Sequence, residues 1–234
     1  LKDLESKKII VFRKFKNAYA LFSGSDIDLD ELTELNKSKI KDDYDIILSQ
    51  LPQLQPIVAK KHFHETGTQR IYQRFCLVLT NIKKAVEEIV RLDISPASAG
   101  AFIFLCKTKE DTQKDFEDKL KELSQIKFPK PVIIGTSKNF NEFFNYALEI
   151  AALKRVKSTV DAIEGDAIAK KELNGRLTAY QNLLFNSLYL NFENADWTFN
   201  KNKVKENNLS SIASLISNEV FKLTPIIHNE LVVR

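Results

Sequence analysis

Three short apolar runs, separated by amphipathic segments, limit the folds that this chain can adopt. The runs 71–79, 101–106 and 132–134 are rich in aromatic and branched residues, which is typical of strands. The run 101–106 is apolar throughout, which indicates burial on both faces. Amphipathic helices are expected between the runs, at 81–92 and 110–126. Because such strand–helix–strand units form right-handed crossovers with parallel pairing, the sequence predicts a small, mainly parallel sheet with flanking helices.

Outside these runs the apolar residues recur with the spacing of helices. The expected helices are 28–35, 39–50, 139–153, 166–192 with a weak break at Gly175, and 209–223. A polar linker is expected at 200–208, and 18–22 or 57–63 could add an edge strand. The predicted fold is therefore α/β, followed by an all-α C-terminal region. The expected domains are 1–30, the tail of a preceding helical or winged-helix unit; 31–137, the α/β domain; and 138–234, the helical region.

The composition is that of an ordinary folded protein. Hydrophobic residues make up 44% and charged residues 28%, which excludes intrinsic disorder and a coiled-coil rod. No apolar run approaches the roughly 18–20 residues of a transmembrane helix, so no membrane association is expected. Cys76 and Cys106 are too few for a disulfide framework, so we expect buried thiols and a cytoplasmic location. The chain begins with Leu1 and has no methionine, and we expect it to be a piece of a longer protein.

The first candidate motif lies where the segment 18–22 ends. Gly24-Ser25 is followed directly by the Asp-x-Asp pair Asp26 and Asp28. In minimal nucleotidyltransferases such a pair holds Mg²⁺ for phosphoryl transfer, because hard cations prefer oxygen ligands. There, however, about ten residues separate the Gly-Ser pair from the carboxylates. The other interpretation is a strand-to-helix turn in which Asp28 or Asp30 caps the next helix.

The second candidate motif is the basic, polar segment 60–70. We expect its contact residues to be Lys60, Lys61, His62, His64, Thr66, Gly67 and Arg70. Free N–H groups near Gly67, together with a nearby arginine, suit a phosphate group or an acidic partner, so nucleic-acid or anion contact is predicted. Alternatively, His62 and His64 would share one side of a strand and could bind zinc. A purely structural polar segment is the third interpretation.

No motif of known catalytic function is complete in this sequence. None of the six glycines stands in a phosphate-binding loop, in a dinucleotide-binding fingerprint or in a nucleophile elbow. We therefore predict no catalytic residue and no cofactor for the segment itself. On its residues alone, the chain is interpreted as a positioning or interaction module.

Three strings carry a family resemblance. They are 19–28, beginning Tyr-Ala-Leu-Phe-Ser-Gly-Ser-Asp; 56–70, which contains Ala-Lys-Lys-His-Phe-His-Glu-Thr-Gly; and 224–231, Thr-Pro-Ile-Ile-His-Asn-Glu-Leu. Their order and spacing resemble the region downstream of the ATPase core in large bacterial P-loop proteins of phage-defence islands. Among these proteins, the chain resembles the P-loop ATPase of BREX systems. The resemblance covers nearly the whole chain.

The resemblance implies a parent protein that binds and hydrolyses ATP with Mg²⁺. Such a parent would act on or near DNA, with other subunits of a defence complex as partners. No phosphate-binding loop is present here, so the chain would be a non-catalytic segment that positions or couples other parts. Two alternatives stay open: a Mg²⁺-dependent nucleotidyltransferase that uses Asp26 and Asp28, and a pure protein-interaction scaffold.

Overall fold

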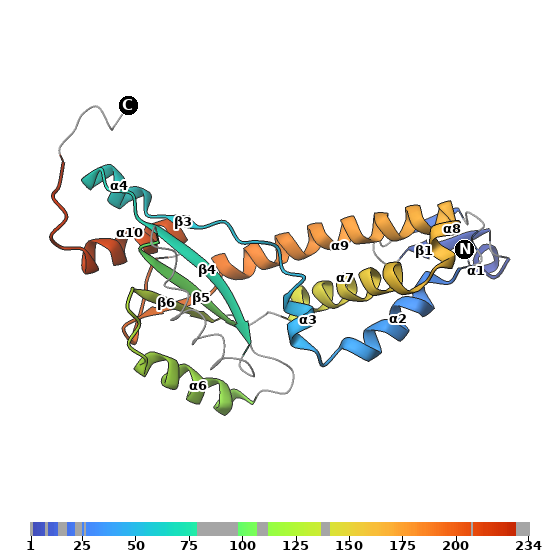
Figure 1. Ribbon diagram of the computed structural model, residues 1–234, viewed down its shortest axis with the longest axis horizontal. Helices are drawn as coiled ribbons and strands as arrows, with labels where there is room; N and C mark the ends of the chain where they lie inside the picture. The colour runs from blue at the N-terminus through green and yellow to red at the C-terminus, as the bar shows by residue number, and fades with distance from the viewer. Residues whose placement is uncertain are drawn as a thin grey trace. The chain divides into compact units, whose positions relative to one another are not determined.

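The computed structural model divides the chain into two compact units, each made of two separate segments (Figure 1). The described residues are 2–7, 9–13, 18–21, 25, 27–78, 98–106, 112–136, 141–206 and 208–227. Unit 1 comprises Leu1–Pro52 and Asn141–Leu188, and unit 2 comprises Gln53–Phe140 and Tyr189–Arg234. The units therefore alternate along the chain. They differ from the consecutive ranges expected from the sequence, because each unit is completed by a segment from the second half of the chain.

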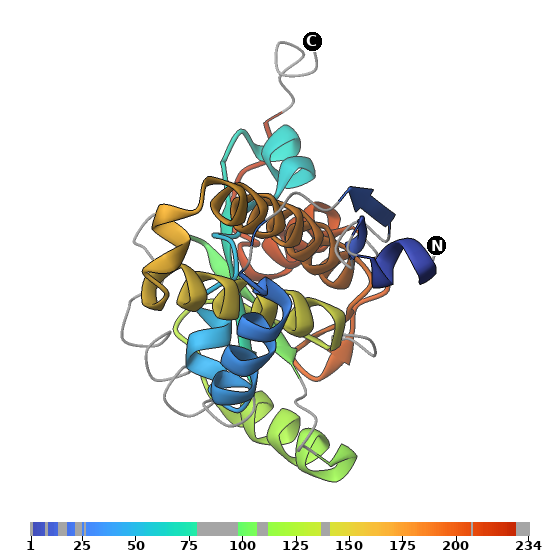
Figure 2. The ribbon, with the colours of Figure 1, turned by 90° about the vertical axis from the view of Figure 1, so that its right-hand side faces the viewer.

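Unit 1 is mainly helical. Its elements are α1 (Lys2–Ser6), β1 (Ile10–Arg13), β2 (Ala18–Leu21), α2 (Leu29–Ile40), α3 (Tyr44–Leu48), α7 (Asn141–Thr159), α8 (Ala162–Gly165) and most of α9 (Ala167–Glu193). The helices α2 and α7 lie side by side (Figure 2). Leu29 of α2, Leu153 and Val156 of α7 and Leu173 of α9 share one apolar cluster. Because apolar burial is the main favourable term in folding, this cluster holds together segments that are far apart in the sequence.

Side-chain caps fix where the helices α2 and α3 begin. Asp28 accepts hydrogen bonds from the backbone N–H groups of Asp30 and Glu31, so the cap expected for this helix is confirmed. Asp43 accepts a bond from the N–H of Ile46 and starts α3. This cap explains why the single helix expected at 39–50 is replaced by the end of α2 and a separate α3. The segment expected as a strand at 18–22 is present over Ala18–Leu21 as β2, but it pairs antiparallel with β1 in a separate two-stranded sheet and adds no edge to the predicted sheet.

Unit 2 is built on a six-stranded mixed sheet. Its strands are β3 (Ile57–Val58), β4 (Ile71–Val78), β5 (Gly100–Cys106), β6 (Val132–Thr136), β7 (Asp196–Phe199) and β8 (Asn202–Lys203), in that spatial order. Its helices are α4 (Lys60–Thr66), α6 (Gln113–Gln125), α10 (Leu209–Val220) and the end of α9. The neighbours β4, β5 and β6 pair in parallel, as predicted from the three apolar runs. The edge strand expected within 57–63 is present as β3, although only over two residues.

Two fold predictions need correction: the sheet is not mainly parallel, and the C-terminal region is not all-α. β3, β7 and β8 all pair antiparallel. β7 and β8 form a hairpin where a helix end and a polar linker were expected. Asn200 and Lys201 between them have φ values of 48° and 69°, as a two-residue type I′ turn requires. The four residues of β7 are too few for a periodic signal, and its partner β6 lies far away in the chain.

The central strand β5 is buried on both faces, as its apolar run predicted. On one face Ile103 and Leu105 pack against Phe116 and Leu123 of α6. On the other face the Phe104 ring stacks on Phe192 of α9, with 4.8 Å between the centroids. The Trp197 ring of β7 lies edge-on to Phe102 on this second face. The sheet is thus the middle layer of unit 2.

The two cysteines lie on neighbouring parallel strands, with their sulfur atoms 3.1 Å apart and no disulfide between them. Cys106 is fully buried and Cys76 is partly buried. Burial, together with the contact with Cys76, raises the pKa of the Cys106 thiol well above its ordinary value. Cys106 therefore stays protonated and packs as a small apolar residue.

The longest described helix, α9, runs without a break through Gly175. The interruption that this glycine was expected to cause is absent, because a single helical glycine costs only about 1 kcal/mol and the surrounding packing compensates for it. Charged residues recur along the first half of the helix. Among the described residues, no helix combines the length and the hydropathy needed to cross a membrane.

Replacing Gly135 by alanine is expected to destabilise unit 2. A Cβ atom at this position would lie 2.3 Å from Cζ3 of the buried Trp197, so the ring would have to move. We expect a loss of about 1–3 kcal/mol in the free energy of unfolding. Urea unfolding followed by the fluorescence of Trp197, the single tryptophan, measures it.

The matched control is Gly175→Ala, where nothing lies within 4 Å of the added Cβ. In the interior of α9 this change is expected to stabilise the helix by about 0.5–1 kcal/mol, as followed by circular dichroism. An unchanged urea midpoint for Gly135→Ala would contradict the close packing of β6 and β7.

Candidate functional site

Two of the three strings singled out in the sequence meet in unit 2. The segment after α10 returns to the end of α4, where the N–H of Ile227 donates to the backbone carbonyl of Glu65 at 2.9 Å. Nη2 of Arg70 donates to Oγ1 of Thr224 at 3.4 Å. A Cβ on Gly67 would lie 3.2 Å from Cδ1 of Ile227. The string 56–70 and the described part of the string 224–231 therefore form one continuous site, whereas the first string belongs to unit 1.

Serine hydroxyl groups of α10 accept hydrogen bonds from the first backbone N–H groups of α4. Oγ of Ser210 accepts from the N–H of Lys60 at 3.3 Å and donates to the carbonyl of Val58 at 2.6 Å. Oγ of Ser214 accepts from the N–H of Lys61 at 3.1 Å. A helix N-terminus usually offers such N–H groups to water or to an anion. Here they are used internally, so the first backbone N–H groups of α4 are not available to an anion.

His62 is a buried structural residue of this site. Its side chain is 1% exposed, and Nδ1 lies 2.5 Å from Oδ1 of Asn218 in α10. Because Oδ1 can only accept, Nδ1 carries the proton and donates. The Nδ2 group of Asn218 donates in turn to Oε2 of Glu65 at 3.1 Å. Nε2 of His62 is buried and has no hydrogen-bond partner among the described residues.

The expectation that His62 and His64 share one side of a strand is wrong. Both lie in the helix α4, where residues two positions apart point in clearly different directions. His62 points into the protein and His64 is exposed. The zinc-binding alternative therefore loses its geometric basis.

Arg70 ties the segment after α10 to the sheet. Its guanidinium lies over the ring of Phe221, 4.0 Å from the centroid, and bonds to Thr224 as described. Nearby, the Tyr72 hydroxyl pairs with Oγ of Ser217 at 2.9 Å. Burial raises the pKa of Tyr72, while the bond to Ser217 acts in the opposite direction. The hydroxyl is thus a neutral partner that fastens α10 to β4.

The predicted contact residues divide into an exposed group and a structural group. Lys60, Lys61 and His64 have exposed side chains, and Lys60 and His64 lie one turn apart on α4. Thr66 is buried and donates to the carbonyl of His62, and Gly67 ends α4 at a φ of 68°. His62, Thr66, Gly67 and Arg70 shape the site, whereas only the exposed group can meet an external anion through unhindered side chains.

The residues of the alternative metal site do not come together as a described site. Asp26 lies outside the described residues, and Asp28 uses one carboxylate oxygen to cap α2. Oγ of Ser25 donates to Asp166 at 2.7 Å, and Asp166 also caps the start of α9. Across the described part of the chain, no group of three or more histidine, cysteine, aspartate or glutamate side chains is placed to hold a metal ion.

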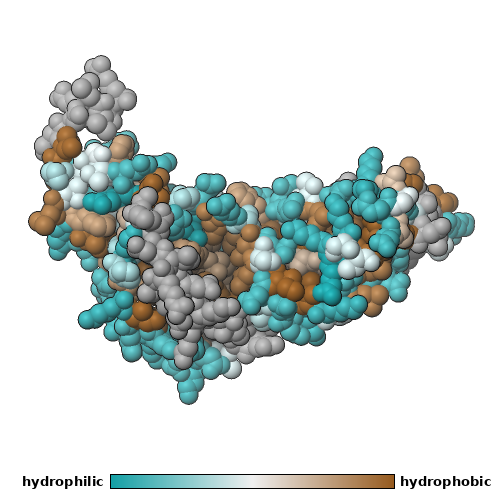
Figure 3. Space-filling view, viewed as in Figure 1, coloured by the Kyte–Doolittle hydropathy of each residue, from teal (hydrophilic) through white to brown (hydrophobic). Residues whose placement is uncertain are grey.

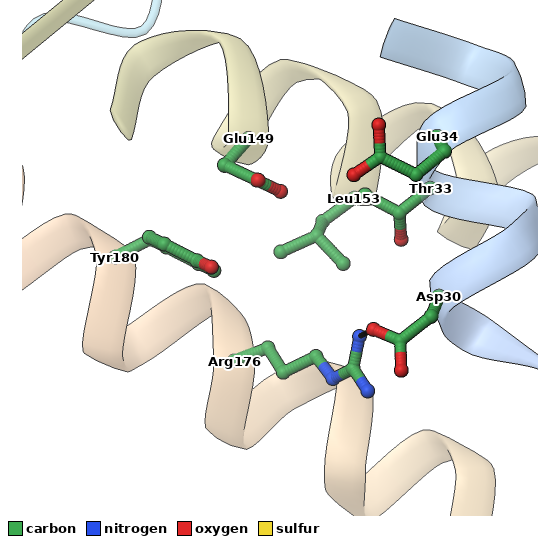
Figure 4. A pocket seen from close by; sticks show the side chains of 7 residues that line it. All are labelled: Asp30, Thr33, Glu34, Glu149, Leu153, Arg176 and Tyr180. Atoms are coloured by element: carbon green, nitrogen blue, oxygen red, sulfur yellow. Dashed lines mark hydrogen bonds and ion pairs between the residues drawn. The ribbon is translucent and has the colours of Figure 1, made fainter. Parts of the chain in front are cut away.

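Unit 1 contains a separate charged cluster around Arg176 that sequence reasoning missed (Figure 4). The Arg176 side chain is 8% exposed and bonds to Asp30 and Glu172, each at 2.7 Å. Lys37 pairs with Glu149. Burial alone would lower the pKa of Lys37, but its bonds to Glu149 and to a second glutamate outweigh burial and raise it. The adjoining cavity of about 20 Å³ holds roughly one water molecule, so the cluster braces α2, α7 and α9 rather than binding a ligand.

The pair formed by His62 and Asn218 can be tested with a double-mutant cycle. Asn218→Ala leaves the buried Nδ1–H of His62 without an acceptor, which we expect to cost about 1–3 kcal/mol of unfolding free energy. In a His62→Phe background the same change should cost clearly less, since no buried donor is left. Urea unfolding of the four proteins gives the coupling energy, and additivity within about 0.5 kcal/mol would contradict the described pair.

Comparison with known proteins gives no match. No protein-family model matches this chain, and neither the curated proteins nor the solved structures contain one that is similar to it at a significant level. What can be said of function therefore rests on the residues and on their geometry. The family suggested by the three strings stays a prediction.

Proposed function

We propose that this chain is a non-catalytic segment of a large, ATP-dependent phage-defence protein of the BREX type. In that protein it positions or couples other parts, in a complex with further defence subunits, in the cytoplasm and with DNA as a second partner. ATP and Mg²⁺ belong to the parent, outside this segment. The chain itself carries no phosphate-binding loop, in agreement with a supporting role.

One observation carries the proposal: two strings that were singled out separately in the sequence contact each other in unit 2. Arg70 and Thr224 are 154 positions apart and share a hydrogen bond. The backbone N–H of Ile227 donates to the carbonyl of Glu65 in α4. A motif that is distributed over distant strings is expected when both strings serve one structural task.

The contacts suggest how such a segment could couple two parts of a larger protein. The segment that leaves α10 is held by Glu65 and Arg70, and Arg70 directly precedes β4. α10 itself is fastened to the sheet through Ser217 and Tyr72. If the segment after α10 moved, the hydrogen bonds that connect it, through Arg70, to the start of β4 would be strained or broken. Such a chain of contacts is a candidate route for coupling, whose strength only measured coupling energies can give.

The nucleotidyltransferase alternative gains no support from the described residues. Its carboxylate Asp28 is occupied as the N-cap of α2, where it satisfies two backbone N–H groups. The pure protein-interaction scaffold differs from the proposed role only in its partners. Salt-dependent DNA binding separates these two possibilities.

The chain is expected not to bind ATP. Isothermal titration with ATP and Mg²⁺ should give no binding heat at concentrations up to about 1 mM, since a phosphate-binding loop is missing from the sequence. Micromolar affinity would overturn the assignment of a non-catalytic segment.

The parent is tested separately by reading the coding sequence on both sides of the chain. A G-x-x-x-x-G-K-[ST] motif upstream in the same reading frame is expected. An extended protein that contains this motif should bind ATP in the same titration. An adjoining reading frame without any such motif would overturn the proposed parent.

The exposed lysines of α4 are expected to contribute to DNA contact. The double variant Lys60→Glu/Lys61→Glu should weaken the binding of a fluorescent DNA duplex and lower the slope of log K against log salt by about 2, because each phosphate contact contributes about 0.9. Fluorescence anisotropy between about 50 and 200 mM salt measures this slope. The control Lys154→Glu/Lys157→Glu has the same change of charge on α7 in unit 1. Equal effects of the two double variants would show that α4 makes no specific contact.

A further inference from the structure

A broad groove lies in unit 2 beside the second half of α6. It encloses about 920 Å³ between this part of α6, the segment that leads to β6, the β7–β8 hairpin and the end of α10. Its floor is apolar and includes Leu123, Val132, Ile134 and Phe199, which are at most 9% exposed. Ile126 and Val220 line it with more exposed side chains, at 37% and 41%. Apolar surface thus continues from the core to the opening of the groove. In the space-filling view of the chain, hydrophobic patches alternate with hydrophilic surface (Figure 3).

The charged residues that line the groove are all lysines, Lys121, Lys127, Lys130 and Lys201. Lys121 also pairs with Asp118 of α6, which does not line the groove. Lys127 lies two residues beyond the end of α6, where a cation is favourable near the helix C-terminus. This explanation does not cover Lys201, which lies in the turn between β7 and β8. The positive charge therefore belongs to the groove as a whole and not only to the helix end.

We propose that this groove binds an acidic, amphipathic helix of a partner protein. An apolar helix face would cover the floor and remove it from water, while acidic residues on either side of that face would meet the four lysines. The favoured occupant follows from charge complementarity, which sets partner choice and orientation more than affinity.

Other ligands would match only part of the groove surface. A nucleic-acid backbone would meet the lysines but would leave the apolar floor without a partner. A fatty acid would cover the floor, yet its one carboxylate could pair with only one or two of the lysines. This inference concerns a different surface from the α4–α10 site and does not depend on the proposed function, so each can fail alone.

The probe for the test is a fluorescein-labelled peptide of about 18 residues, or five helical turns. It carries leucine at i, i+3, i+4 and i+7 spacing and glutamate at most other positions, so one face of the helix is apolar. We expect saturable binding to the whole chain by fluorescence anisotropy, and an increase in helical circular dichroism on binding. A peptide of the same composition, scrambled to destroy the apolar face, should bind at least about tenfold more weakly, since the loss of one or two buried leucines exceeds that factor.

Variants of the chain test whether the peptide binds in the groove. Lys127→Glu/Lys201→Glu should weaken binding about tenfold or more, because two attractions become repulsions. Its control, Lys114→Glu/Lys205→Glu, makes the same charge change at exposed residues outside the groove. Ile126→Asp tests the apolar contact, and Leu223→Asp, at a side chain that is 99% exposed, is its control. All four variants change exposed residues and should keep the unfolding midpoint of the unchanged chain.

Four results would overturn the proposal. The first is no saturable peptide binding at about 1 mM protein, which corresponds to a free energy weaker than about 4 kcal/mol. The second is equal binding of the scrambled peptide, and the third is equal binding by the groove variants and their controls. The fourth is that laurate or a DNA duplex binds through Lys127, Lys201 and Ile126 while the peptide does not, which would assign the groove to a lipid or to a nucleic acid.

Discussion

Burial of β5 on both faces is the constraint on which the rest of unit 2 depends. A strand with apolar side chains on both sides needs a covering layer above and below, because exposed apolar surface is unfavourable in water. α6 supplies one layer through Phe116 and Leu123. The end of α9 and β7 supply the other through Phe192 and Trp197. Unit 2 can therefore form only when segments from distant parts of the chain arrive together.

The need to cover both faces of β5 also places the elements that form the candidate site. α10 is held near the second face by the bond between Tyr72 and Ser217, and it carries the serines and Asn218 that fix α4. Polar groups buried at such a junction must be paired, since an unpaired one costs about 1–3 kcal/mol. The network of His62, Asn218 and Glu65 meets this demand for all but one ring nitrogen. Segment 224–227 is then placed by Arg70 and Glu65 on a surface that α4 and α10 have already formed.

The two basic features of unit 2 differ in their physical setting. Lys60 and Lys61 lie on a short helix whose first backbone N–H groups are already bonded, so only their exposed side chains are available to an outside partner. The four lysines of the groove surround apolar surface, where a bound partner would exclude water and strengthen each charge contact. In the Arg176 cluster of unit 1 the charges instead pair with one another, as Arg176 bonds to Asp30 and Glu172.

Local patterns in the sequence predicted the parallel strands β4, β5 and β6, most of the described helices, and a cap at Asp28 or Asp30. Such features depend on apolar spacing and on hydrogen bonds over a few residues, which a single sequence displays directly. The helix expected at 81–92 lies outside the described residues. Only the tertiary structure decided that β7 pairs with β6, that His62 bonds to Asn218 and that four lysines surround one apolar groove. Each of these joins residues that are far apart in the chain, and their meeting depends on how layers pack around β5 and not on any local pattern.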